Sequence, residues 1–585
     1  GVAKDGAFYL FTLRLIPIFP FFMINLLMGL TPISTKTFFV VSQLGMLPGT
    51  AAYVNAGTQL GRISSLSEIL SPVFLVSFAI IGVLPLLSRA GLSYYRDKKL
   101  FSRFERPVQF DYNLIVIGAG SAGLVSAYIA AALKAKVALI EKHKMGGDCL
   151  NTGCVPSKAL IRSAKMLSYA TRAKEFGFRE SKVEFDFAEV MERVQRVIRA
   201  VEPHDSTERY SKLGVDCITG NARIVSPYLV EVDGRKLSAR SIIIATGARP
   251  LVPPIPGLDQ IEFLTSDTIW NIRECPKRLV VLGGGPIGVE LAQTFHRLGA
   301  RVTQIEAYDC ILNREDVDVS DYLCHRLSTE GIKILTKHRA ERIEVQDNGK
   351  FLICDSPAGE VRIEFDQLLL ALGRKPNVSG FGLEELGVEI DKRGTIVHDS
   401  FLRTNYSNIF VCGDVAGPYQ FTHTAAHQAW FASVNSLLSP FKKFRADYRV
   451  IPWCTFTDPE VARVGLNERE AKERKIEYSV TRYEIDDLDR AIADSEAHGF
   501  VKILTPPASD KILGVTIVGS HAGDIISEHI LAMKHGLGLN KILGTIHIYP
   551  TLAEANKYAA GIWRRAHTPA FAMGLLQKFN TWRLG

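Results

Sequence analysis

The feature that most constrains the fold is a glycine-rich pattern that occurs twice, about 165 residues apart. In each copy a short apolar strand leads into Gly-x-Gly-x-x-Gly, a helical stretch follows, and a second strand ends in a glutamate 23 residues after the first glycine. The glycines allow a tight turn, close approach of the backbone to a pyrophosphate, and packing of helix on strand. The chain is therefore predicted to contain two dinucleotide-binding α/β units. The first has strands at 113–117 and 137–140 with Gly118, Gly120, Gly123 and Glu141; the second has strands at 278–282 and 301–305 with Gly283, Gly285, Gly288 and Glu306.

Two cysteines, Cys149 and Cys154, lie in the segment 146–158 between these units. Five residues of ideal helix would separate them by about 7.5 Å along the axis, beyond the Cα separation of about 4.4–6.8 Å in a disulfide. Pairing would therefore need a distorted turn, for which Asn151 and Gly153 are suitable residues. Taken alone, this segment is equally consistent with two unrelated core cysteines.

The N-terminal region has a different composition. Residues 1–95 carry seven charged side chains out of 130 in the chain. The run 69–88 is uncharged over twenty residues, long enough to cross a bilayer as a helix, although a buried soluble helix is the alternative. By the positive-inside tendency, the flank that follows places the rest of the chain in the cytoplasm. That flank contains Arg89, Arg96, Lys98, Lys99, Arg103 and Arg106.

The segment 8–30 is interrupted by Pro17, Pro20 and Gly29, which favours a re-entrant hairpin over a straight span. Arg14 lies inside it. An arginine buried in lipid is costly and is usually functional, so Arg14 is a functional candidate. The alternative is an arginine whose head group reaches the interface from near a helix end.

The net charge of +8 follows the same division, because residues 1–95 and 96–110 each contribute +3. The basic balance therefore gives no argument for nucleic-acid binding. Nine cysteines in 585 residues are too few for a secreted disulfide scaffold. No secretory signal and no metal-ligating set are predicted.

With the two units and the cysteine pair, the chain resembles the flavoprotein disulfide reductases, the family of dihydrolipoyl dehydrogenase, glutathione reductase and mercuric reductase. The resemblance runs from about 111 to 561. Its further motifs stand in order: ATG at 245–247, GVE at 288–290, ALGR at 371–374, VCGD at 411–414, FTDPEV at 456–461 and HIYPTLAE at 547–554.

The resemblance implies an α/β fold with two Rossmann-like dinucleotide-binding domains of the glutathione reductase type, then a C-terminal α+β dimerisation domain. The apolar N-terminal region adds an α-helical membrane module before them. The expected divisions are a membrane module at 1–95, a basic linker at 96–110, an FAD domain at 111–255 and 371–447, an NAD(P) domain at 256–370, a dimerisation domain at 448–565 and a tail at 566–585.

The resemblance also implies roles. FAD would bind the first unit and Asp414, and NAD(P)H the second unit. NADH is expected over NADPH, because Glu306 would bind a ribose diol and repel a 2′-phosphate. Cys154 would be the thiol that faces the flavin and Cys149 the thiol that attacks the acceptor. Lys158, paired with Glu290, would stabilise negative charge on the flavin.

A homodimer is implied, with 547–554 of one chain reaching the disulfide of the other. The family's histidine general base, five residues before Glu554, is replaced by Tyr549, a poor base with an ordinary pKa near 10. Either His547 replaces it, or the thiol works without a strong base. Mercuric reductases also have tyrosine here, but no cysteine follows Cys454 to match their C-terminal cysteine pair. His423 and Cys454 are expected in core or surface roles.

The segments FTLRLIPIFPFF, NLLMGLTPI and GMLPGTAAYVNAGTQL, within about 90 residues, resemble the later part of the DedA/VTT membrane family. In that family such segments are associated with moving lipids or lipid-linked substrates. A multi-pass protein of the inner membrane is therefore expected, with the bilayer as a partner and the flavoprotein part in the cytoplasm.

Two hypotheses follow. The first is a membrane-tethered, FAD-dependent NAD(P)H oxidoreductase that acts on a thiol/disulfide or metal acceptor. The second is a membrane transporter of lipids or small molecules that is regulated by redox state. A dihydrolipoyl dehydrogenase serving a soluble complex is disfavoured by Tyr549 and the membrane module.

Overall fold

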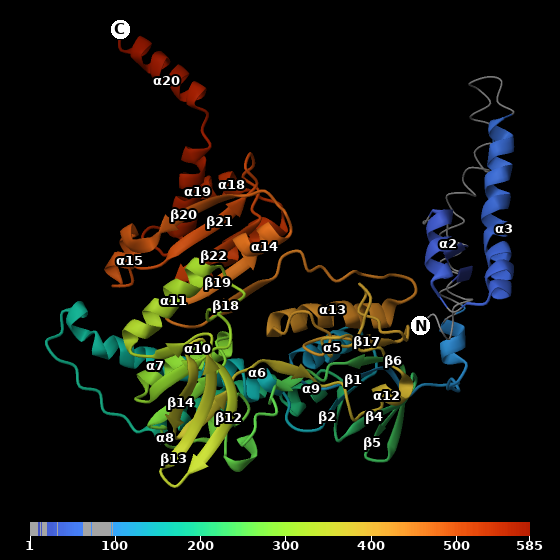
Figure 1. Ribbon diagram of the computed structural model, residues 1–585, viewed down its shortest axis with the longest axis horizontal. Helices are drawn as coiled ribbons and strands as arrows, with labels where there is room; N and C mark the ends of the chain where they lie inside the picture. Colours follow the sequence, from blue (N-terminus) through green and yellow to red (C-terminus); the bar gives the residue numbers. More distant parts are fainter. Residues whose placement is uncertain are drawn as a thin grey trace. The chain divides into compact units, whose positions relative to one another are not determined.

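The computed structural model describes residues 10–11, 13–14, 20–31, 33–61, 72, 95 and 97–585. The chain divides into two compact units, Gly1–Arg106 and Pro107–Gly585. Figure 1 shows the N-terminal helices in dark blue, and each unit is described by itself below.

The N-terminal unit contains two main described helices, α2 (Phe21–Gly29) and α3 (Thr35–Leu60). The Ser34 hydroxyl caps α3 by accepting a hydrogen bond from the Thr37 backbone N–H at 3.2 Å. Among the described residues, α3 is the one helix long and apolar enough to cross a membrane. The predicted span 69–88 lies outside the described residues except for Pro72, so multi-pass topology is not supported.

Arg14 is buried, with 6 % of its surface exposed. Its guanidinium donates to the side-chain oxygen of Asn25 in α2 and, at 3.3 Å, to the hydroxyl of Ser42 in α3. The Phe21 ring lies 4.5 Å from the guanidinium carbon. The structure therefore places Arg14 as a polar link between two apolar helices, with partners for the charge that burial would otherwise destabilise.

The larger unit begins with the first predicted nucleotide-binding unit, and both of its predicted strands are confirmed. Five parallel strands form the order β3-β2-β1-β6-β17, and β4 and β5 extend the sheet in antiparallel fashion from β6. Helices α5 and α13 pack together on this sheet. The bounds are β1 Tyr112–Ile117, α5 Ser121–Ala132, β2 Val137–Glu141, β3 Val215–Thr219, β4 Ala222–Ser226, β5 Leu229–Val232, β6 Arg235–Ile244, β17 Ile409–Val411 and α13 Thr422–Leu438.

The second nucleotide-binding unit is inserted before β17, and its two predicted strands are also confirmed. Its parallel sheet has the order β11-β10-β9-β15-β8, and a separate antiparallel sheet has the order β12-β13-β14. The two-stranded pair β7–β16 accompanies the chain's passage out of and back into the first unit. The bounds are β7 Ala248–Pro250, β8 Leu264–Thr265, β9 Arg278–Leu282, α10 Pro286–Arg297, β10 Arg301–Ile305, α11 Val317–Glu330, β11 Lys333–Leu335, β12 Arg339–Gln346, β13 Gly349–Ser356, β14 Gly359–Phe365, β15 Gln367–Leu370, β16 Arg374–Pro376 and α12 Leu383–Leu386.

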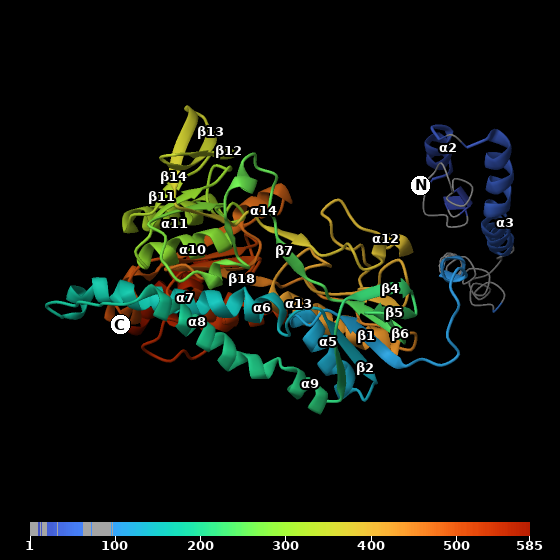
Figure 2. The ribbon, with the colours of Figure 1, turned by 90° about the horizontal axis from the view of Figure 1, so that it is seen from below.

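Between β2 and β3 the chain forms a helical excursion that carries the cysteines. Helix α7 packs against α8 and against α10 of the second unit, and Figure 2 shows it alongside α10. This path brings the N-terminal end of α7 between the two units. The bounds are α6 Gly147–Asn151, α7 Cys154–Thr171, α8 Phe187–Val201 and α9 Thr207–Lys212.

The C-terminal part is a five-stranded antiparallel sheet in the order β18-β19-β22-β21-β20, covered by helices. Its apolar core includes Ile503, Ile517 and Trp563. The bounds are β18 Pro452–Thr455, β19 Glu460–Gly465, α14 Glu468–Glu473, β20 Ser479–Glu484, α15 Asp489–Ala493, β21 Phe500–Thr505, β22 Gly514–Gly519, α16 Ala522–Ile525, α17 Ser527–Lys534, α18 Leu539–Leu543, α19 Glu554–Ala566 and α20 Ala570–Arg583.

Candidate functional site

Both glycine turns and both predicted redox cysteines open onto one cavity of about 2260 Å³. The first unit contributes Gly118, Gly120 and Glu141 to its wall, and the second contributes Gly283, Gly285 and Glu306. Cys149, Cys154, Lys158, Glu290 and Asp414 also line it. The arrangement is suited to two nucleotides that meet near a cysteine pair.

The first turn has the geometry that its glycines allow. Gly118 has φ +100°, and a Cβ at Gly123 would lie 1.7 Å from the Gly118 carbonyl oxygen, so neither position accepts a side chain without strain. The Glu141 carboxylate accepts hydrogen bonds from the backbone N–H of Ala119 at 2.7 Å and of His143 at 2.9 Å. These bonds fix the carboxylate at the edge of the cavity, where a ribose diol would meet it.

The second turn repeats this geometry. Gly283 has φ +118°, and a Cβ at Gly288 would lie 2.1 Å from the Gly283 carbonyl oxygen. Glu306 accepts hydrogen bonds from the backbone N–H of Gly284 at 2.6 Å and of Tyr308 at 2.9 Å. In the described part of the chain, no atom of another segment would lie within 4 Å of a Cβ at Gly285, which faces the cavity. The backbone at Gly285 is therefore open to close approach by a pyrophosphate.

The cysteine segment contains the distorted turn that the spacing predicts. Helix α6 ends at Asn151 and α7 begins at Cys154, with Gly153 at φ −121° and ψ −109° between them. The Asn151 side-chain amide donates to the carbonyl oxygens of Met145 and Gly147, at 2.9 Å each. The break brings Cys149 and Cys154 into hydrogen-bonding contact as two thiols.

The two thiols differ in their electrostatics. A hydrogen bond from Cys149 lowers the pKa of Cys154 to about 6, and the Thr422 hydroxyl and the charge of Lys158 act in the same direction. The same hydrogen bond, together with burial, raises the pKa of Cys149. The Thr422 hydroxyl lies 3.4 Å from the Cys154 sulfur. Thiolate character is therefore concentrated on Cys154, which is exposed to the cavity.

Lys158 stands one turn after Cys154 on α7 and is held by Glu290 of α10. Its ammonium lies 2.9 Å from a carboxylate oxygen of Glu290, whose side chain is 8 % exposed, and 4.3 Å from the Phe456 ring centroid. The other carboxylate oxygen accepts the Phe456 backbone N–H at 2.8 Å. Glu290 thus joins α7, α10 and the segment after β18, and keeps a positive charge at the cavity wall.

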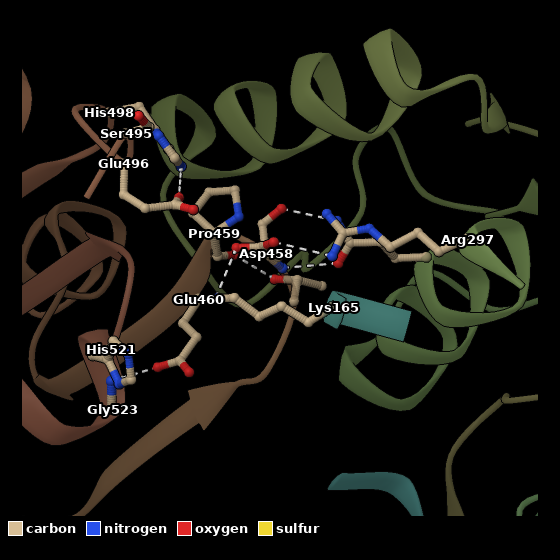
Figure 3. A network of polar contacts seen from close by, with 12 residues as sticks. Lys165, Arg297, Asp458, Pro459, Glu460, Ser495, Glu496, His498, His521 and Gly523 are labelled. Carbon is tan, nitrogen blue, oxygen red and sulfur yellow. Dashed lines mark hydrogen bonds and ion pairs between the residues drawn. The ribbon is translucent and has the colours of Figure 1, made fainter. Parts of the chain in front are cut away.

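A buried polar network supports this junction (Figure 3). Asp458 accepts Lys165 of α7 at 3.3 Å and Arg297 of α10 at 3.0 Å. Burial acts to raise the pKa of Asp458, but the two cations outweigh it and lower the pKa. Close by, Glu460 accepts the Gly523 backbone N–H at 2.9 Å. The C-terminal domain is thereby fixed to the two helices that carry Lys158 and Glu290.

Asp414 lies at the cavity wall in a chain of charges. Arg374 pairs with Asp148 and lies 3.5 Å from the Asp414 carboxylate. Burial raises the pKa of Asp414, and Arg374 only partly opposes this effect. The position suits a carboxyl group that hydrogen-bonds a ribityl or pyrophosphate region.

The C-terminal candidates lie elsewhere in the chain, and none of His547, Tyr549 and Glu554 lines the described cavity. Both ring nitrogens of His547 are engaged: Nε2 lies 3.1 Å from Glu528, and Nδ1 lies 3.0 Å from the Thr545 carbonyl oxygen. The Tyr549 hydroxyl donates to Asp489 at 2.8 Å, and this hydrogen bond raises the pKa of Tyr549. Glu554 is buried and accepts the Thr551 backbone N–H at 3.3 Å.

Some cavity residues were not predicted from the sequence. Thr422 and Arg374 were not assigned functional roles, since their contacts with Cys154 and Asp414 depend on tertiary structure. His423 and Cys454, expected in core or surface roles, both line the cavity, and Cys454 also packs against the apolar core of the C-terminal sheet. The His423 ring donates from Nε2 to the Pro452 carbonyl oxygen, 2.8 Å away, and stacks on Phe421.

In the described part of the chain, one acidic cluster has metal-like spacing: Asp316, Asp318 and Glu468. The ammonium of Lys502 lies 2.8, 2.7 and 3.2 Å from these carboxylates. Lys502 is 1 % exposed, and its one positive charge partly balances the three carboxylates from within the cluster. It acts as an ionic link between the second nucleotide-binding unit and the C-terminal sheet.

Comparisons with known proteins agree with this geometry. Residues 112–429 match the family "Pyridine nucleotide-disulphide oxidoreductase", 451–560 match its dimerisation domain, and 1–59 match the VTT domain. A mercuric reductase from Bacillus cereus is 36% identical over 450 residues, covering 77% of this chain and 71% of that protein. A dihydrolipoyl dehydrogenase from Chlamydia trachomatis is also 36% identical over 450 residues, covering 76% of this chain and 95% of that protein.

The fold also matches a solved structure. The Cu(II) complex of the HOCl-induced flavoprotein disulfide reductase RclA from Escherichia coli superimposes with a TM-score of 0.69 at 28% identity, covering 76% of this chain and 98% of that chain. Enzymes of the matched family depend on FAD and use NAD(P)H. The chain therefore belongs to the pyridine nucleotide-disulphide oxidoreductase family and carries a VTT domain at its N-terminal end.

Proposed function

We propose that the protein is a membrane-tethered oxidoreductase that carries electrons from NADH through FAD to the Cys149–Cys154 pair, and from there to a thiol, disulfide or metal acceptor. One observation carries the proposal: the Cys154 thiol, with its lowered pKa, opens onto the same cavity as both glycine turns. A homodimer is part of the proposal, supported by the dimerisation-domain match.

The residues at the cavity fit the two nucleotides. Gly118, Gly120, Gly123, Glu141 and Asp414 would hold FAD, because the backbone at Gly118 and Gly120 lines the cavity and the Glu141 carboxylate is fixed there by backbone hydrogen bonds. The corresponding set for NADH is Gly283, Gly285, Gly288 and Glu306. FAD held by these residues would supply an acceptor for a hydride and a donor of the electron pair to the cysteine disulfide.

The chain's own groups then have separate tasks. Lys158, held by Glu290, supplies a positive charge that favours anionic species at the cavity wall. Thr422 donates to Cys154 and favours its thiolate. Cys149, the thiol with the raised pKa, releases its proton as it attacks or binds the acceptor. The two thiols close to a disulfide when the acceptor has taken two electrons.

The hydrogen bonds made by His547 favour a metal acceptor over a disulfide acceptor. A disulfide acceptor needs a base for the thiol proton, and the engaged ring nitrogens of His547 make it a poor one. A soft cation instead binds thiolates directly. Two proteins similar to this chain are a mercuric reductase and a disulfide reductase solved as its Cu(II) complex.

The test of the proposed function is an acceptor screen on the detergent-solubilised chain with Hg(II), Cu(II), disulfides and quinones. Turnover that is unchanged in Cys149→Ala with every acceptor would contradict the proposal.

We expect His547→Ala to lower turnover by less than about tenfold, below the ~10²–10⁴ loss that follows removal of a general base. Tyr549→Phe should have the larger effect, through positioning of the acceptor, and Tyr549→His should raise activity with dihydrolipoamide. Steady-state kinetics measure these effects, with flavin content and dimer formation as controls. A loss of a hundredfold or more in His547→Ala would identify His547 as the base.

We expect a higher kcat/KM for NADH than for NADPH, because the Glu306 carboxylate at the second turn would repel a 2′-phosphate. Arg301 opens β10 and lies five residues before Glu306, roughly 16 Å away along a strand, so it is a poor phosphate clamp. Glu306→Gln should reduce the preference, whereas Glu341→Gln, elsewhere on the cavity wall, should leave it unchanged. A higher kcat/KM for NADPH in the unaltered protein would refute the assignment.

We expect a chain that begins at Arg106 to be water-soluble, dimeric and loaded with flavin, because Pro107–Gly585 is a compact unit with its own cores. The full chain should stay in the inner-membrane fraction, with the flavoprotein part accessible from the cytoplasmic side. Membrane fractionation and analytical ultracentrifugation measure both. If the shortened chain failed to fold, the two units would share a core.

A second candidate, a redox-regulated transporter, is favoured by the VTT match and by the burial of Arg14 between α2 and α3. It predicts flux of a lipid or small molecule that responds to NADH, with little turnover of a soluble acceptor. Parallel flux and turnover assays on reconstituted vesicles separate the two functions.

A further inference from the structure

The terminal helix α20, Ala570–Arg583, has an apolar surface that nothing in the described chain covers. None of its residues is buried. The exposed fractions are 77 % for Phe571, 51 % for Leu575, 49 % for Phe579 and 75 % for Trp582. The match to the dimerisation domain ends at 560, so α20 lies beyond the segment shared with the family.

These four side chains form one face. Positions 571, 575, 579 and 582 follow the i, i+4, i+8, i+11 spacing of a single helical stripe. The Phe579 and Trp582 rings lie 5.9 Å apart. The opposite side mixes the polar Gln577, Asn580 and Thr581 with the apolar Met573 and Leu584, so what distinguishes the stripe is its three aromatic rings.

Cations border the stripe. Lys578 falls beside Phe571 on the helix surface, and the Arg583 guanidinium lies 5.7 Å from the Phe579 ring centroid, on the other border. After Glu554 the chain contains no aspartate or glutamate, but it contains Lys557, Arg564, Arg565, Lys578 and Arg583. The segment therefore carries positive charge alone.

The start of α20 is anchored. Trp563 is buried near the end of α19, and its indole N–H donates to the Thr505 hydroxyl at 3.1 Å. His567, in the short connection, stacks on Trp563 with ring centroids 4.4 Å apart. The helix is thus presented from a fixed point on the C-terminal domain.

We propose that α20 docks on an anionic lipid surface, with the stripe of Phe571, Leu575, Phe579 and Trp582 at the boundary between headgroups and acyl chains. An apolar stripe with aromatic residues, bordered by lysine and arginine, is the pattern of helices that lie in the membrane interface. Each cation near an anionic surface strengthens binding by roughly fivefold. Pairing with α20 of a second copy would instead bring Lys578 and Arg583 against like charges with no carboxylate on the helix. Docking of α20 on lipid does not depend on the redox chemistry of the cysteine pair.

The test uses the full chain reconstituted into vesicles of brominated phosphatidylglycerol or of brominated phosphatidylcholine, because bromine in the acyl chains quenches tryptophan that enters the bilayer. The N-terminal unit contains no tryptophan; the five are Trp270, Trp430, Trp453, Trp563 and Trp582. Subtracting the emission of a Trp582→Phe variant isolates Trp582. We expect blue-shifted, quenched Trp582 emission in phosphatidylglycerol vesicles, and loss of most of that quenching in phosphatidylcholine or at about 1 M salt, where the Debye length is about 3 Å.

Matched variants separate the two sides of the helix. Phe579→Ser removes part of the stripe and should abolish the quenching, whereas Met573→Ser removes an exposed apolar side chain outside the stripe and should preserve it. NADH-dependent turnover, measured on the same vesicles, should be unchanged in both, so failure of the redox proposal would be seen separately. Trp582 that is unquenched in phosphatidylglycerol would overturn the proposal. If it were also shielded from iodide, a second copy would be the occupant.

Discussion

A Cys154→Ser variant is expected to lose the long-wavelength absorption band that two-electron reduction produces in the unaltered protein, since that band requires a thiolate against the flavin. Cys149→Ser is expected to keep the band and to lose acceptor turnover by at least about a thousandfold, as removal of a nucleophile does. The reason lies in the thiol pair, where a hydrogen bond from Cys149 lowers the pKa of Cys154 to about 6. Anaerobic absorption spectroscopy and steady-state kinetics measure the two effects.

The intensity of the same absorption band should also depend on pH, and the thiol pKa determines the direction of the change. A lowered thiol pKa means that the thiolate persists above about pH 6 and is protonated below it, so the band should fade as the pH decreases through that value. In Cys149→Ser, a serine hydroxyl replaces the thiol donor, and Thr422 and Lys158 remain. If Cys149→Ser lost the band and Cys154→Ser kept it, the roles of the two thiols would be exchanged.

Gly285→Val is expected to raise the KM for NADH by about a hundredfold, the scale of loss that follows misplacement of a reactant by about an ångström. A Cβ at this position would meet no described protein atom within 4 Å, and the backbone there is extended, with φ −75° and ψ 176°. Valine is therefore compatible with folding, but its side chain would occupy the cavity where a pyrophosphate approaches. Flavin content and chemical reduction of the cysteine pair should stay normal.

The other glycines provide controls for this prediction. Gly120→Val, at the equivalent position of the first turn, should instead deplete the flavin. Gly288→Val places a Cβ 2.1 Å from the Gly283 carbonyl oxygen, so it should lower stability or yield rather than KM alone. An unchanged KM for NADH in Gly285→Val would mean that the nucleotide does not pass over this turn.

The nucleotide-binding units could be predicted from the sequence down to their strands. The reason is that their signals are local: glycine at Gly118 and Gly283 is required by positive φ and close backbone contact. The distortion between Cys149 and Cys154 was predictable for the same reason, since it follows from spacing and helix geometry. By contrast, Thr422 is 268 residues from Cys154 along the chain, and their contact depends on the packing of α13 and α7.

The membrane part was less predictable. Its clearest sequence signal, 69–88, lies outside the described residues except for Pro72, whereas α3, with Pro48 and several small residues, has a weaker apolar pattern. Arg14 donates hydrogen bonds to Asn25 and Ser42, and these partners could not be derived from the sequence because they depend on how two apolar helices pack. The proposed roles of His547 and Tyr549 could not be derived from sequence spacing for a similar reason, because they depend on a second chain.

The most direct measurement of the central claim is thiol trapping of the purified full chain with an alkylating reagent, followed by mass spectrometry. Before reduction, Cys149 and Cys154 should be protected as a disulfide. One equivalent of NADH under anaerobic conditions should make both available to alkylation, and addition of the acceptor should protect both again. If their labelling did not change with NADH while the acceptor was still reduced, electrons would leave the flavin by another route and the account would be contradicted.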